Sequence, residues 1–324
     1  NPDDAYKVAQ SRIKKAKDES ATMLDLSGLG LTSVPPEIGQ LTWLRELYLS
    51  DNKLTTVPSK IGRLTTLEKL FLNDNQLTDV LPEIGNLTVL EEVWLHKNRL
   101  TNIPLEIGLL TELRRFYLSD NQLTSIPPEI GQLTRLTYLS LRQNQLTFLP
   151  PEIGRLTELR ELYLWRNQLT SVPAEIDQLS KLERLRLEDN PHLSIPPEIV
   201  AQARRPQVIL GYLKALHRIK KAKDEGAAEL NLGGMGLTAV PPEIGELTSL
   251  KEVNLQNNKL KAVPSEINKL ARLATLYLYG NELMDVPSEI LQMRGLRQLS
   301  LNYNQLTTVP VSYTHLTLPT SFLV

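Results

Sequence analysis

The sequence contains no cysteine, no long apolar run and almost no net charge. Its 324 residues include 36 basic and 37 acidic side chains, which give a formal net charge of −1. A balance this even gives no net field that would draw the chain to nucleic acid or to a membrane surface, so we expect neither as a partner. A run of about 18 apolar residues is also missing, and the sequence therefore predicts no membrane-spanning segment.

The absence of cysteine bears on chemistry and on compartment. It excludes a thiol nucleophile and a disulfide framework. Repeat proteins outside the cell often close their ends with disulfides, so the absence favours a reducing compartment and predicts a cytoplasmic location. No secretory signal is visible, and because the sequence begins at Asn1 and not at methionine, the true N-terminus stays open.

Motifs of catalysis and of metal binding are absent as well. No G-x-x-x-x-G-K-[ST] occurs, so this segment has no P-loop for a nucleotide. Serines and carboxylates recur with a fixed period, as surface residues do, and form no unique triad. The histidines lack metal-ligand spacing; they are His96, His192, His217 and His315. We therefore predict no enzyme activity, no catalytic residue, no metal, no cofactor and no small-molecule substrate in this segment.

What the sequence has instead is a repeat of 23 residues. Leucines at fixed positions surround one asparagine in the pattern L-x-x-L-x-L-x-x-N-x-L-x-x-[IV]-P. The pattern and its period resemble those of leucine-rich repeat proteins. The asparagines follow one another at this spacing in two series, Asn52, Asn75, Asn98, Asn121, Asn144, Asn167 and Asn190, and then Asn258, Asn281 and Asn304.

Each repeat position predicts a place in a solenoid. In Leu47-x-Leu49 the alternation predicts a short strand whose leucines point to one side and whose Glu46 and Tyr48 point to the other. The prolines after the strand and the Glu-Ile-Gly-x-Leu that follows predict an extended return and a short helical turn on the convex side. The resemblance implies an α/β leucine-rich repeat solenoid, a right-handed β–α superhelix with a parallel sheet on its concave face and with helical caps.

We expect the asparagines to form a structural ladder from repeat to repeat. A side-chain amide can donate and accept at once, so it can bond the backbone groups that the turn leaves unpaired. Removing one amide leaves those buried groups without a partner, which costs about 1–3 kcal/mol.

The chain is predicted to contain five segments. Ser11–Ser20 is nearly copied at His217–Gly226, so the chain caps one array of repeats and then repeats the start of an array. The segments are an N-terminal capping helix (1–20), a first array of eight repeats (21–203), a helical cap or linker (204–226), a second array of four repeats (227–310), and a non-repeat tail (311–324) that we interpret as a truncation or an artefact.

The strand position between the two leucines predicts a surface for a partner. In the first array it is often aromatic, and neighbouring strands lie about 4.7–4.9 Å apart, close enough for rings to stack. Aromatic and arginine side chains are typical of protein-binding hot spots. The alternative is drift from a repeated Leu-Tyr-Leu, with no ligand on the rings. The candidates are Tyr48, Phe71, Trp94, His96, Tyr117, Arg142, Tyr163, Trp165 and Arg186.

Two longer motifs carry a narrower resemblance. Residues 121–134 match throughout the long repeat of bacterial intracellular leucine-rich repeat proteins, and they are similar to that of Ras-associated scaffolds. Residues 190–202 and 209–213 resemble the segment that joins the repeats to the GTPase module of bacterial Roco (Roc–COR) proteins.

These resemblances imply a non-catalytic scaffold that binds a protein of unknown identity through the concave face of the first array. One alternative is the sensor segment of a larger signalling enzyme, a Roc–COR GTPase or a kinase, whose catalytic domain lies outside this chain. A structural spacer or a variable surface protein is a third.

Overall fold

The computed structural model describes residues 2–193 and 195–307. It divides into two compact units, one of residues 1–206 and one that starts at Gln207. The tail predicted at residues 311–324 lies outside the described residues.

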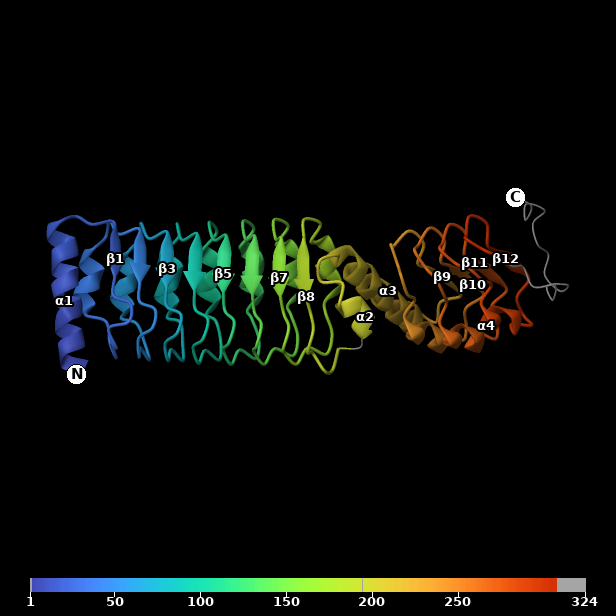
Figure 1. Cartoon of the computed structure of the whole chain (residues 1–324), viewed down its shortest axis with the longest axis horizontal. Helices are drawn as coiled ribbons and strands as arrows, with labels where there is room; N and C mark the ends of the chain where they lie inside the picture. The colour runs from blue at the N-terminus through green and yellow to red at the C-terminus, as the bar shows by residue number, and fades with distance from the viewer. Residues whose placement is uncertain (1, 194, 308–324) are drawn as a thin grey trace. The chain divides into compact units, whose positions relative to one another are not determined.

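The first unit is a row of short parallel strands with one helix at its start (Figure 1). Helix α1 (Pro2–Asp18) buries Ala9, Ile13 and Ala16 and packs against the first strand. Each strand residue pairs with the equivalent residue of the next repeat, as Leu24 does with Leu47, which confirms the predicted parallel solenoid. The eight strands follow sequence order: β1 (Met23–Asp25), β2 (Glu46–Tyr48), β3 (Lys69–Phe71), β4 (Glu92–Trp94), β5 (Arg115–Tyr117), β6 (Tyr138–Ser140), β7 (Glu161–Tyr163) and β8 (Arg184–Arg186).

Between strands the chain returns through one short helical turn, as the sequence predicted. Seven of these turns are 3-10 helices, and a proline or Leu81 stands immediately before each. The last turn of the unit is α-helical. The turns are η1 (Pro36–Gln40), η2 (Ser59–Arg63), η3 (Pro82–Asn86), η4 (Leu105–Leu109), η5 (Pro128–Gln132), η6 (Pro151–Arg155), η7 (Ala174–Gln178) and α2 (Pro197–Val200).

A glycine in most of these turns lets neighbouring repeats approach each other closely. A Cβ at Gly62 would lie 2.9 Å from the Glu83 Cβ, which is too close for two such atoms, and 3.0 Å from the Glu83 carbonyl oxygen, so the backbone of the next repeat would have to shift. Val200 and Leu291 occupy the equivalent position in the two α-helical turns, whereas Asp177 and Asn268 occupy it in turns that remain 3-10 helices.

The asparagine side chains bond each repeat to the one before it. Asn75 Oδ1 accepts from the backbone N–H of Leu54 (3.0 Å), and Asn75 Nδ2 donates to the carbonyls of Leu49 (2.9 Å) and Leu72 (3.1 Å). The other nine predicted asparagines make the same three bonds in their own repeats. Two of the three link successive repeats, so every asparagine holds the stack together.

The second unit has the same construction with fewer strands. Helix α3 (Pro206–Glu225) contributes Ala215, Ile219 and Ala222 to a core that includes Leu230 and Leu232. Four parallel strands follow, β9 (Glu229–Asn231), β10 (Glu252–Asn254), β11 (Thr275–Tyr277) and β12 (Gln298–Ser300), with the turns η8 (Pro242–Glu246), η9 (Ser265–Lys269) and α4 (Ser288–Leu291).

The second unit repeats the start of the first one, bond for bond, at equivalent positions. Arg12 Nη1 donates to the Asp25 carbonyl (2.9 Å), and Arg218 Nη1 donates to the Asn231 carbonyl (2.6 Å). Two further bonds correspond in the same way, Lys17 Nζ to Gln40 Oε1 (2.8 Å) and Lys223 Nζ to Glu246 Oε2 (2.5 Å). Helix α3 therefore closes the sheet β9–β12 in the way that α1 closes β1–β8.

Candidate partner-binding face

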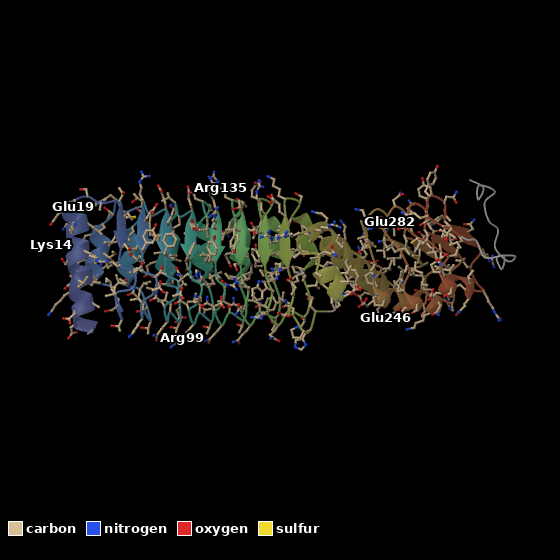
Figure 2. All side chains as sticks on the ribbon, viewed as in Figure 1. Lys14, Glu19, Arg99, Arg135, Glu246 and Glu282 are labelled. Atoms are coloured by element: carbon tan, nitrogen blue, oxygen red, sulfur yellow. The ribbon has the colours of Figure 1, made fainter. Side chains whose placement is uncertain are left out.

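In each strand of the first unit the central residue is buried, whereas most of its neighbours on either side point outward. The central side chains Leu47, Leu70 and Val93 are fully buried. We name the opposite surface, formed by the first and third residues of each strand and by the second and third residues after it, the strand face. Arg135 and Arg99 mark opposite edges of the first unit (Figure 2).

Six aromatic rings form a continuous row across strands β2 to β7. Tyr48 and Phe71 are stacked, with ring centroids 4.4 Å apart and ring planes at 6°. The next centroid distances are 5.1 Å from Phe71 to Trp94 and 4.8 Å from Trp94 to Tyr117. The row ends with Tyr117 to Tyr138 (4.6 Å) and Tyr138 to Tyr163 (5.4 Å). These six residues are the ring row: Tyr48, Phe71, Trp94, Tyr117, Tyr138 and Tyr163.

Tyr138 belongs to the ring row but is absent from the predicted set. In β6 the third strand position is Ser140, and the ring that continues the row comes from the first strand position. Burial among the neighbouring rings raises the pKa of Tyr138 to about 12. An aromatic residue two positions before a small one in the third strand position would have been the sequence signal.

Glutamates two residues earlier hold the polar atoms of three rings. Tyr48 Oη donates to Glu46 (2.7 Å) and Trp94 Nε1 donates to Glu92 (2.6 Å). Tyr163 Oη donates to Glu161 in the same way. These hydrogen bonds fix the rings and use their donors, so these three rings offer a contact surface that is mainly apolar.

His96 lies beside the middle of the ring row. Its ring centroid is 5.5 Å from that of Trp94 and 6.3 Å from that of Tyr117. Its Nε2 is 3.9 Å from a carboxylate oxygen of Asp74, and its buried Nδ1 has no hydrogen-bond partner among the described residues. Burial lowers the pKa of His96 below 6.5, so the imidazole is neutral at neutral pH.

Beyond the ring row, three arginines surround Trp165. The guanidinium carbons of Arg142 and Arg166 are each 5.1 Å from the indole centroid, and that of Arg186 is 5.8 Å away. We name these four residues the Trp165 cluster. Arg166 was not predicted, because it follows the strand and lies outside the alternating positions from which the candidates were chosen. Cations over an indole face are held there by its negative π surface.

Two comparisons identify the family of the chain. Models of a leucine-rich repeat region and of leucine-rich repeats match residues 22–126, 111–151 and 134–191. The structure of a leucine-rich repeat protein of Leptospira interrogans is 30% identical, with a TM-score of 0.50, and the match covers 91% of this chain and 93% of that one. The chain is a leucine-rich repeat protein.

Other comparisons add less. A crystal structure of a TDR receptor is 25% identical with a TM-score of 0.51, and the match covers 94% of this leucine-rich repeat chain but only 48% of the receptor chain. No curated protein matches the sequence.

Charges on the strand face of this leucine-rich repeat protein are paired between neighbouring repeats. Lys69 bonds Glu46 (2.9 Å) and Arg184 contacts Glu161 (3.3 Å), and each pair joins equivalent positions of adjacent strands. The hydrogen bond to Lys69, together with the one from Tyr48, lowers the pKa of Glu46. Such exposed pairs contribute only about 0–1 kcal/mol each, but they leave the face without a strong field of either sign.

The rest of the described chain offers little chemistry. No three of its described histidine, aspartate and glutamate residues come together as metal ligands. None of its described helices combines the length and the apolar character needed to cross a bilayer. A cavity of about 820 Å³ lies at the end of the first array, lined by Leu187, Asn190 and the turn α2. Its lining includes Glu188 and Asp189, the carboxylates that pair with Arg186 and Arg166.

Proposed function

We propose that the first unit is a non-catalytic scaffold that binds a protein partner on its strand face, with the ring row as the main contact. The observation that carries the proposal is the unbroken contact of six rings from Tyr48 to Tyr163. A row that is already fixed loses little side-chain freedom when a partner arrives, and this lowers the free-energy cost of association.

The dimensions of the face support a partner of protein size. Six strands at a spacing of about 4.8 Å make a ring row roughly 24 Å long. A stable interface needs about 800 Å² on each side, which the ring row and its flanking residues can supply. Aromatic residues at the centre of such an interface commonly carry most of the binding free energy.

The paired charges argue against other partners. Nucleic acid is held by unpaired lysines and arginines that neutralise phosphates, and on this face most cations already have carboxylate partners. We therefore propose a protein partner, and no nucleic acid, membrane, cofactor or small-molecule substrate for this segment.

A sensor segment of a larger signalling enzyme is the second candidate. Its support is the resemblance of residues 190–202 and 209–213 to the joining segment of Roco proteins. In this structure those residues supply α2 and part of α3, and α3 leads into the sheet β9–β12. A partner-binding strand face is compatible with either role.

The proposal is tested with the double substitution Trp94→Ala and Tyr117→Ala in the full chain. A phage-displayed random peptide library is selected on the wild-type protein, and the retained clones are then measured on the variant. Removing two central rings should weaken binding roughly 30-fold or more, as loss of an aromatic hot spot does. The melting temperature should change little, because both rings lie on the face and not in the leucine core.

Phe148→Ala is the matched control, since it removes an exposed ring (53% exposed) that lies outside the strands. The clones should bind this control as they bind the wild type. Clones that ignore the double substitution, or a library that yields no clone at all, would contradict the proposed function.

A further inference from the structure

We propose that the Trp165 cluster binds a carboxylate of the partner, so that the partner carries an acidic group beside the apolar segment that covers the ring row. This inference rests on the function proposed above and specifies the chemistry at one end of the same face.

The cluster adjoins the end of the ring row. Tyr163, the last ring, is the paired neighbour of Arg186 in the sheet, and Trp165 follows Tyr163 by two residues. A partner that lies along the row therefore reaches these arginines directly after the last tyrosine.

Two of the arginines have their terminal nitrogens free. Arg166 is held through its Nε by Asp189 (3.4 Å), and Arg186 through its Nε by Glu188 (2.5 Å). The Nη atoms of these two side chains have no partner among the described residues, and the side chains are 58% and 39% exposed. Each therefore presents an open pair of N–H donors, the arrangement that a carboxylate accepts in a bidentate manner.

The other arginines nearby are occupied at one or both of their Nη atoms. Arg142 Nη1 donates to Gln143 (3.1 Å) and its Nη2 lies 3.3 Å from Asp120. Arg184 Nη1 donates to the Tyr163 hydroxyl (2.9 Å). Within the Trp165 cluster, Arg166 and Arg186 are thus the two arginines with both Nη atoms free, and both guanidinium groups are positioned by the one indole of Trp165.

Charge alone does not explain the site, because Asp120, Glu188 and Asp189 balance the three arginines of the cluster. What favours a carboxylate is the geometry of unpaired donors that are already oriented. A guanidinium can donate to one carboxylate from its Nε edge and to a second from its Nη end, since it has five N–H donors. An uncharged group would gain less from these charge-assisted hydrogen bonds.

Fluorine NMR of the full chain containing fluorotryptophan tests the proposal. The sequence has three tryptophans, and single replacement of each by phenylalanine assigns the signals of Trp43, Trp94 and Trp165. The probes are acetyl-phenylalanine with a free carboxylate, the amidated dipeptide acetyl-Phe-Glu-amide, and its neutral counterpart acetyl-Phe-Gln-amide.

The Trp165 signal should shift in a saturable manner with a carboxylate probe, at millimolar concentration, and not with the neutral probe. A shift with the first probe identifies a chain end as an acceptable source of the carboxylate, and a shift with the second identifies a side chain.

The double substitution Arg166→Gln and Arg186→Gln should weaken this response at least tenfold. Glutamine is compatible with the left-handed backbone at Arg166 (φ 55°), because Gln143 occupies the equivalent position in the preceding repeat with φ 54°. Arg166→Lys with Arg186→Lys keeps the charge but loses the paired donors, and should retain only part of the response.

Arg160→Gln is the control, because Arg160 is a similarly exposed arginine that pairs with Glu183 outside the cluster. Equal shifts with the neutral and the charged dipeptide, no shift of the Trp165 signal at all, or an undiminished shift in the glutamine variant would overturn the inference. None of these results bears on the library selection, which depends on Trp94 and Tyr117. The two proposals can therefore fail separately.

Discussion

The same backbone carries two different faces in this chain. In the first unit the third strand position presents Tyr48, Phe71 and Trp94, and in the second unit the equivalent positions present Asn254, Tyr277 and Ser300. Among the described residues of the second unit, Tyr279 and Tyr303 are the one ring pair in contact, at 5.0 Å. The leucines and asparagines thus build the scaffold whatever the outward side chains are.

The outward polar residues also serve the scaffold in places. Asp25 Oδ1 accepts from the backbone N–H of Ser27 (2.8 Å), and Asn231 Oδ1 accepts from that of Gly233 (2.9 Å). Asn254 does the same for Gln256 (3.0 Å). Side chains used in this way stabilise their own turn. Two of the four third strand positions described in the second unit are used in this way, against one of the eight in the first unit, so the face of the first unit is less committed to local structure.

The largest effects should come from the leucine core, which each unit builds in the same way. Leu49→Ala and Leu255→Ala remove equivalent, fully buried side chains. Each should cost its own unit about 2–5 kcal/mol, from lost burial and the cavity that remains. Hydrogen exchange, followed separately in each unit, measures both costs. If one variant lost protection throughout the core of its unit and the other lost it only at surface amides, the two cores would not be equivalent.

The next effect should come from the asparagines. Asn52→Ala and Asn258→Ala each remove the same three bonds, two donated to carbonyls and one accepted from a backbone N–H. Asn258→Ala also removes the bond that Asn258 accepts from the Met235 N–H (3.0 Å). We expect each to cost about 1–3 kcal/mol, because buried backbone groups are left without partners. Urea unfolding of the two variants should give similar losses. Costs that differ severalfold would break the equivalence of the units at this position.

A smaller effect separates the two faces at high pH. The pKa of Tyr138 is about 12 in the folded chain against 10.0 for an ordinary tyrosine. Because the folded value is raised, this tyrosine contributes stability below pH 10 that is lost as the pH rises from 10 to 12. The pKa of Tyr48 is raised as well, by the glutamate to which it donates, and burial raises the pKa values of Tyr117 and Tyr163. The tyrosinate absorbance should therefore show a late phase that Tyr138→Phe reduces and that Tyr303→Phe, at a 77% exposed position in the second unit, leaves in place.

The smallest expected effect concerns His96, whose counterpart in the second unit is Asn302. Burial lowers the pKa of His96 below 6.5, so the unfolded chain takes up the proton at a higher pH than the folded chain. The stability that the neutral imidazole contributes is complete above pH 6.5 and is lost as the pH falls through the folded pKa. Denaturation at a series of pH values should show this loss, and His96→Asn should remove it. A variant that keeps the same pH dependence would exclude His96 as its cause.

Most of the fold could be predicted from the sequence because each repeat position has one physical task. The alternation in Leu47-x-Leu49 predicts the strand, and the spacing of Asn52 and Asn75 predicts which strands are neighbours. The full extent of the similarity between the units was less visible. The copy is close where α1 and α3 carry the same lysines and arginines and again at residues 30–39 and 236–245. Elsewhere the equivalence rests on hydrogen bonds such as those of Asp25 and Asn231 to backbone N–H groups.

The candidate face was predicted in outline and missed in two details. Tyr138 was overlooked because side chains of adjacent strand positions lean toward each other, so that a ring from the first position can fill the gap above Ser140. Arg166 was overlooked because its place over Trp165 depends on a left-handed backbone after the strand (φ 55°), which no alternation reveals. The Nη atoms of Arg166 and Arg186 are free because Asp189 and Glu188 pair with the Nε atoms. The spacing of charges along the chain does not reveal which nitrogen of an arginine a carboxylate contacts.

The asparagine bonds also bear on how such a gene can change in length. Each bond joins a repeat to its neighbour in the same manner, as in Leu77 N–H to Asn98 and Leu100 N–H to Asn121. If residues 76–98 were lost through unequal recombination, the Leu72 carbonyl would take the place of the Leu95 carbonyl as the acceptor for Asn121. Every donor at the new junction would find an acceptor at its usual distance. Inheritance can therefore shorten or extend this protein by whole repeats, and selection then acts on what the outward side chains recognise.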